Sequence, residues 1–136
     1  GALFGMNICL AGPVEFAPTE EMLNYLTKHD LSSNFEHQPD PVVAARGADI
    51  LYTDVWVSMG CEEEAQERKR IMSPYQVTDA ILQESNSNSL FMHCMPTHPG
   101  EEVSESVLAS PQAILFDQAE NRLHIQKAIL RQLTQS

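Results

Sequence analysis

The sequence predicts an α/β fold built on a parallel sheet of about five strands. Short apolar runs alternate with segments of helical character along all 136 residues. Such alternation is typical of βαβ units, whose right-handed crossovers pair their strands in parallel. The two most apolar runs are expected at the centre of the sheet, because central parallel strands are buried on both faces. A chain of this length fits one domain with its own core.

The expected strands are short apolar runs bounded by turn-forming or polar residues. In chain order they are 6–13, 34–40, 49–57, 89–95 and 112–118. Gly12 and Pro13 stop the first run. The second run is weakly apolar and is expected at an edge. The third ("DILYTDVWV") and the fourth ("SLFMHCM") are the strongest candidates for buried strands.

The expected helices follow from capping residues and from the placement of charge. In chain order they cover 18–30, 41–47, 62–75, 78–85, 104–110 and 119–135. Thr19 and Ser104 are suitable N-caps, and Gly47 is expected to end the second helix. Acids open the third helix and basic residues close it, as the helix dipole favours. Strands and helices in this order predict a Rossmann-like sandwich of three layers.

The composition excludes several classes of partner. The chain carries 8 Lys and Arg against 19 Asp and Glu, for a formal net charge of −11. Nucleic-acid binding needs clustered basic residues, and this sequence has no such cluster. No apolar run reaches the roughly 18 residues of a membrane helix. The cysteines, Cys9, Cys61 and Cys94, are widely spaced and fit a reducing compartment, so we expect a cytoplasmic protein.

Polar residues follow the third expected strand. Ligands of parallel sheets bind beyond the carboxyl ends of the strands, which makes these positions candidates for a site. Asp54 would need a partner if it is buried there, and the ammonium group of a ligand would serve. Capping of the following turn explains Asp54 equally well. Ser58, Met59 and Gly60 offer a hydroxyl and backbone N–H groups to a carboxylate or an amine, although a simple N-cap has the same pattern.

Cys94 stands at the end of the fourth expected strand, between His93 and Met95. A free cysteine is most often a small core residue, but at a strand end it is also a candidate nucleophile or acid. His93, Cys94 and His98 resemble part of a zinc site. A structural zinc site uses four closely placed ligands, and no second pair is offered nearby. We therefore predict no metal.

Arg122 is expected at the start of the last helix, where its charge opposes the helix dipole. Bidentate binding of an anion by its guanidinium would explain that placement. A surface salt bridge with Asp117 or Glu120 is the alternative.

Three segments resemble the ornithine carbamoyltransferases. "YTDVWVSMG" is similar to the ornithine loop of that family, "HCMP" to its His-Cys-Leu-Pro motif, and "FDQAENRLHIQKAIL" to its closing helix. The resemblance covers nearly the whole chain and concerns the second, ornithine-binding domain. Met95 replaces the Leu of the motif, and Pro99 stands where many bacterial members have Arg.

The resemblance implies an enzyme that converts carbamoyl phosphate and L-ornithine into L-citrulline and phosphate, without a metal or an organic cofactor. Asp54 and Ser58 would hold the α-amino group of ornithine, and Met59 would offer backbone contacts. The implied contacts to carbamoyl phosphate come from Cys94, Met95 and Arg122. Asp54 and Cys94 are the implied catalytic residues, with Cys94 beside the side-chain amine of ornithine.

The resemblance also implies the domain organisation. Residues 1–118 would form the ornithine-binding α/β domain, and 119–136 would form a helix that packs on an amino-terminal carbamoyl-phosphate domain outside this sequence. Ile125, Ile129 and Leu130 would then expose apolar surface in the isolated chain, which we expect to be inactive. The full-length enzyme would be a homotrimer. The first residues read as the end of a helix, as in a piece of a longer protein.

Two other functions stay open. One is a carbamoyltransferase for another amine, such as putrescine or an acylated ornithine. The other is a non-catalytic amino-acid-binding module. The Ser-Met-Gly segment favours free ornithine, because it provides for the head group of an α-amino acid. The presence of all the implied site residues favours an enzyme.

Overall fold

The computed structural model describes residues 1–57 and 65–135. Its strands are β1 (Ile8–Ala11), β2 (Phe35–Gln38), β3 (Ile50–Thr53) and β4 (Leu90–His93). Its α-helices are α1 (Glu20–Lys28), α2 (Pro41–Ala45), α3 (Ala65–Met72), α4 (Asp79–Glu84), α5 (Glu105–Leu108) and α6 (Leu115–Thr134). Short 3-10 helices cover Ala2–Phe4, Val14–Phe16, Ser32–Asn34 and Ser73–Tyr75. The α/β class predicted from the sequence is therefore confirmed.

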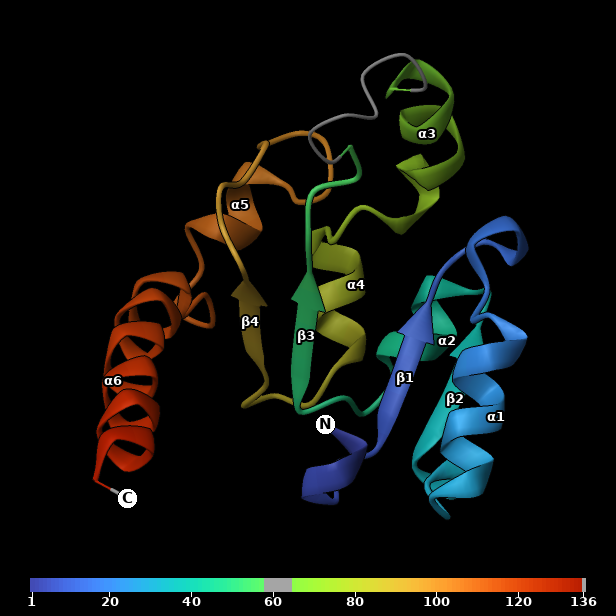
Figure 1. Ribbon diagram of the computed structural model, residues 1–136. Helices are drawn as coiled ribbons and strands as arrows, with labels where there is room; N and C mark the ends of the chain where they lie inside the picture. Colours follow the sequence, from blue (N-terminus) through green and yellow to red (C-terminus); the bar gives the residue numbers. More distant parts are fainter. Residues whose placement is uncertain (58–64, 136) are drawn as a thin grey trace.

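The strands pair in parallel, in two separate ladders. β1 pairs with β2, and β3 pairs with β4, so that Thr53 lies opposite His93. All the strand arrows point the same way in Figure 1, with β1 on the side of β3 that faces away from β4. The expected single sheet of about five strands is not formed among the described residues.

The fifth expected strand is wrong. Ala113 forms only an isolated parallel bridge with Phe91, and the chain enters α6 at Leu115, four residues before the predicted start at 119. A short apolar run such as "AILF" fits a strand or a buried helix turn equally well. In the structure this run leads into a helix, because Leu115 is the first residue of α6 and its side chain is buried in the core. The predicted helix start was therefore misplaced.

The predicted caps are confirmed. The Thr19 hydroxyl accepts the N–H of Met22 at 3.3 Å, and the Ser104 hydroxyl accepts the N–H of Val107 at 3.3 Å. These bonds satisfy N–H groups that a helix start leaves without intrahelical partners. Gly47 follows α2 with φ of 67°, a left-handed conformation that glycine adopts without steric cost.

The hydrophobic core lies between β4, α4 and α5. Its buried members are Val77, Leu82, Phe91, Val103, Val107 and Leu115. By contrast, α6 leaves the body of the protein after its first turn and contacts it chiefly at β4 (Figure 1). Ile125, Ile129 and Leu130 are all at least half exposed, as the sequence predicts. None of the helices in the described ranges combines the length and the apolar character that crossing a bilayer needs.

Replacing Phe91 should reveal where stability resides. Phe91 is fully buried, so Phe91→Ala should lower the free energy of unfolding by about 3–5 kcal/mol, since it removes apolar burial and leaves a cavity. Phe116→Ala is the matched control, because Phe116 is 84% exposed and its loss should cost less than about 0.5 kcal/mol. Urea unfolding followed by circular dichroism measures both. Equal effects of the two substitutions would contradict this placement of the core.

Candidate functional site

The register of β3 against β4 brings two predicted residues together. Thr53 and His93 are partners in the ladder, so the residues that follow them, Asp54 and Cys94, leave the sheet at the same edge. The Cys94 Sγ lies 2.8 Å from Asp54 Oδ1, to which it donates a hydrogen bond. Asp54 Oδ1 also accepts the N–H of Val55 at 2.7 Å. The carboxylate therefore caps its own turn while it holds the thiol.

This contact changes the acidity of the thiol. Partial burial raises the pKa of Cys94 above its ordinary value, and the hydrogen bond to Asp54 and the negative charge of Asp54 raise it further. The thiol is consequently protonated at neutral pH and acts as a donor to the carboxylate. It remains open to solvent, where a ligand can reach it.

The ring of His93 is buried next to Cys94 and is held by the loop backbone. Its Nδ1 accepts the N–H of Met95 at 2.9 Å, so the ring proton is placed on Nε2. Nε2 faces the carboxylate of Glu102 at 3.2 Å, and both side chains are fully buried. Nδ1 is therefore engaged by the loop backbone, and Nε2 lies in the interior without a hydrogen-bond partner among the described residues. His93 therefore positions the loop, and Asp54 is the partner of the thiol.

Glu102 holds the loop 93–98 at both ends. Its Oε1 faces His93 Nε2 at 3.2 Å and accepts the N–H of His98 at 2.6 Å. Its own backbone carbonyl accepts the N–H of Val77 at 2.9 Å, which ties this carboxylate to the core. Met95, between the two ends, has φ of 64°, a conformation that costs a non-glycine residue about 1–2 kcal/mol. The Glu102 contacts give that conformation its support, and the peptide bond from Met95 to Pro96 is cis.

The outcome differs among the remaining predicted site residues. Met95 belongs to the same loop as Cys94, whereas Ser58 and Met59 lie outside the described residues. Arg122 is not at the start of the last helix: it lies seven residues beyond Leu115, on an exposed face of α6. The argument from the helix dipole is therefore wrong for this residue. Among the described residues neither alternative ion pair of Arg122, with Asp117 or with Glu120, is formed, and Glu120 pairs with His124 at 3.2 Å instead.

Sequence reasoning missed the buried pair of His93 and Glu102. His93 could have been found, because it shares one face of β4 with Phe91, two residues before it, and both are buried. Gln118 was also missed: its Oε1 accepts the N–H of His93 at 3.0 Å, and its Nε2 donates to the hydroxyl of Tyr52 at 3.2 Å. Glu102 carried no signal, since its burial depends on how two distant segments fold together.

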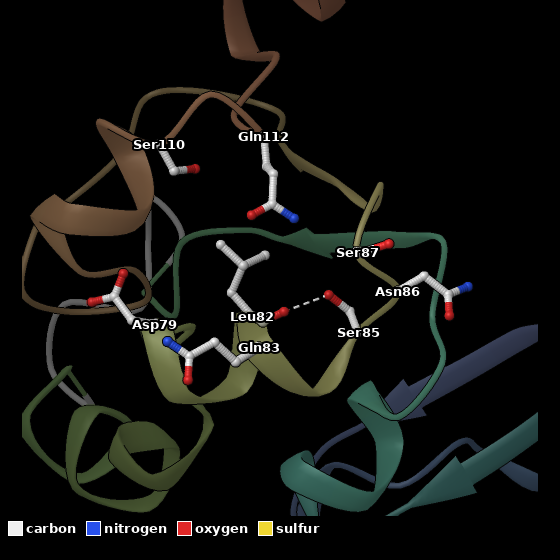
Figure 2. Close-up of a pocket in the computed structure, with 8 residues that line it drawn as sticks. All are labelled: Asp79, Leu82, Gln83, Ser85, Asn86, Ser87, Ser110 and Gln112. Carbon is white, nitrogen blue, oxygen red and sulfur yellow. Dashed lines mark hydrogen bonds between the residues drawn. The ribbon is translucent and has the colours of Figure 1, made fainter.

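A separate pocket lies at the opposite end of β4. Figure 2 shows its lining side chains, which come from α4, from the loop before β4 and from residues 110–112. Ser85 and Gln112 help to close it through hydrogen bonds to Ser89 of 2.7 and 2.9 Å. Because these residues precede β4 or follow α5, the pocket is not part of the Asp54–Cys94 site.

Comparison with known proteins identifies the family of the chain. Residues 1–133 match the family model described as aspartate/ornithine carbamoyltransferase, Asp/Orn binding domain. The chain is 45% identical to the ornithine carbamoyltransferase of Hyperthermus butylicus over 131 residues, which are 95% of this chain and 42% of that protein. It is 43% identical to the Thermococcus kodakarensis enzyme, covering 96% of this chain and 42% of that one.

Two solved structures give the same result. The ornithine carbamoyltransferase of Pyrococcus furiosus matches with a TM-score of 0.84 at 42% identity, over 95% of this chain and 42% of that chain. The anabolic enzyme of Campylobacter jejuni matches with a TM-score of 0.90 at 29% identity, over 98% and 45%. The chain thus spans less than half the length of these relatives. It belongs to the aspartate/ornithine carbamoyltransferase family, and it corresponds to the Asp/Orn-binding domain of that family.

Proposed function

We propose that this chain is the ornithine-binding half of an ornithine carbamoyltransferase, which transfers the carbamoyl group of carbamoyl phosphate to L-ornithine. The observation that carries the proposal is the contact of Cys94 Sγ with Asp54 Oδ1 at the carboxyl ends of β3 and β4, in a chain of this family. An acid beside a protonated thiol suits a zwitterionic amino acid that also presents a second amine.

The chemistry assigns a task to each group. Asp54, together with Ser58 and the backbone of Met59, holds the α-ammonium group of ornithine. The side-chain amine has a pKa of about 10 and must lose a proton before it attacks. Cys94 lies beside that amine, and the carbonyl of Met95 orients the carbamoyl group. The amine nitrogen bonds to the carbamoyl carbon, the bond from that carbon to the phosphate oxygen breaks, and the leaving phosphate takes up the proton that the amine nitrogen loses.

Arg122 is proposed as a contact to carbamoyl phosphate. Its guanidinium suits bidentate binding of the phosphate or of the developing oxyanion. In the described structure it lies on exposed α6, away from the core of the domain. This placement fits a residue that faces a cleft completed by another part of the full-length protein.

A contact with a further domain would account for the exposed apolar face of α6. We propose that residues 119–136 pack on an amino-terminal carbamoyl-phosphate domain, while 1–118 form the ornithine-binding domain. The apolar residues that such a contact would cover are Leu123, Ile125, Ile129, Leu130 and Leu133, all exposed. The full-length enzyme is proposed to be a cytoplasmic homotrimer.

The isolated chain is expected to bind ornithine without converting it into citrulline. Calorimetry should detect weak binding of L-ornithine, and Asp54→Asn should weaken it by about 10- to 100-fold, since a hydrogen bond to a charged group contributes about 1.5–3 kcal/mol. Putrescine lacks the α-amino-acid head group and should bind less well. His124→Ala, which changes an exposed pair on α6, is the matched control.

Citrulline formation by the chain alone should be negligible, because transfer needs both substrates held together. Full turnover by the purified chain would refute its dependence on a second domain. If the Asp54→Asn variant binds ornithine as tightly as the unaltered chain, the proposed site is wrong. If the chain prefers putrescine or N-acetylornithine, that amine replaces ornithine as the proposed substrate.

The thiol gives a pH-dependent readout of the same site. In a Cys9→Ser, Cys61→Ser background, alkylation of Cys94 by iodoacetamide should rise with pH along a curve displaced above that of an ordinary cysteine, because only the thiolate reacts. Asp54→Asn removes the acceptor and its charge, so the curve should move to lower pH and the rate at pH 8.5 should increase. A midpoint that stays in place or rises in Asp54→Asn would contradict the contact.

A further inference from the structure

A second cluster of donor groups lies just beyond the loop that carries Cys94. His98, Glu101 and Glu102 each bring one ligand atom within 4.8 Å of the others. The side chain of His98 is 52% exposed, whereas that of Glu102 is fully buried. One residue of the cluster is therefore held in the protein interior, and another can be reached from solvent.

One carboxylate oxygen of the buried Glu102 lacks a hydrogen-bond donor. Glu102 Oε1 accepts the N–H of His98 and lies 3.2 Å from His93 Nε2, whereas Glu102 Oε2 and His93 Nε2 both have no hydrogen-bond partner among the described residues. A buried carboxylate oxygen without a donor costs about 1–3 kcal/mol or more. The nearest ring nitrogen, His98 Nδ1, is 3.9 Å away, too far for a hydrogen bond. The space between these two atoms is suited to a cation.

We propose that His98 Nδ1, Glu102 Oε2 and a carboxylate oxygen of Glu101 bind a first-row divalent cation of the Zn²⁺ class. One imidazole with two carboxylates is a ligand set that these ions accept, with a fourth position left for water. Two ligands at about 2.0–2.1 Å from a tetrahedral zinc are about 3.4 Å apart. The half-exposed His98 needs to move by only about half an ångström to reach that spacing.

The surroundings of Glu102 already have the arrangement that supports a metal ligand. His93 and the backbone N–H of His98 hold Oε1, which fixes the direction in which Oε2 points. Partners of this kind orient ligating carboxylates and strengthen metal sites. The proposed cation would therefore bind the same carboxylate that anchors the loop of Cys94 and Met95.

The other donor group in the described part of the chain is a poorer candidate. Asp54, His93 and Cys94 also lie within 4.8 Å of one another. However, His93 Nδ1 accepts the Met95 N–H and its Nε2 is fully buried beside Glu102, so a cation at this group would have to displace the Met95 contact or enter the buried side of the ring. This difference allows an experiment to separate the two groups.

Lys69 is a competitor for the proposed site. Its ammonium lies 2.6 Å from Glu101 Oε1 and supplies the positive charge that a metal would otherwise provide. Removing it should tighten cation binding, whereas removing a ligand should weaken binding.

The test is calorimetric titration of the untagged chain with Zn²⁺, together with the absorption spectrum of the Co²⁺ form. We expect one ion per chain. His98→Ala and Glu101→Gln should each weaken binding about tenfold or more, and Lys69→Met should tighten it. His124→Ala, an exposed histidine that also pairs with a glutamate, should leave it unchanged.

Cys94→Ser should also leave binding unchanged, and the Co²⁺ spectrum should lack a sulfur charge-transfer band. Circular dichroism checks that each variant is folded. The proposal is overturned if the chain binds no Zn²⁺, if His98→Ala binds as well as the unaltered chain, or if Cys94→Ser abolishes binding, which would place the ion at Asp54 and Cys94.

Discussion

The parallel pairing of β3 with β4 is the constraint on which the site depends. With Thr53 opposite His93, the next residue of each strand leaves the sheet at the same edge, and the Cys94 thiol meets the Asp54 carboxylate at 2.8 Å. A shift of one residue would turn the side chains of one strand to the opposite face. The apolar side chains of β4, above all fully buried Phe91, hold the register because they must remain in the core.

A second constraint is electrostatic. The carboxylate of Glu102 is buried without a lysine or arginine partner among the described residues, and it is held by a histidine ring and a backbone N–H. These contacts shape the loop between the two histidines, which carries Cys94 and Met95. Burying this carboxylate costs free energy, which the core around Val77 and Val103 must offset. Stability and site geometry are thus joined in one short segment.

Much of this arrangement could be predicted from local patterns. The caps at Thr19 and Ser104, the two central strands and the polar residues at their ends follow from rules that act over a few residues. The misplaced start of α6, and with it the position of Arg122, depended on whether Leu115 enters the core from a strand or a helix. The burial of Glu102 is likewise a tertiary property. Neither outcome is encoded in a short window of sequence.

The most direct measurement of the central claim is a test of proximity at the strand ends. In a Cys9→Ser, Cys61→Ser background, Asp54→Cys places a second thiol beside Cys94, and disulfides form when Cα atoms lie about 4.4–6.8 Å apart. Mild oxidation should convert nearly every chain to the disulfide form. Mass spectrometry detects this form by the loss of two hydrogens per chain. Phe4→Cys, in the 3-10 helix that precedes β1, should remain reduced in the same background. Persistent free thiols in Asp54→Cys, or crosslinking no faster than in the control, would contradict the account.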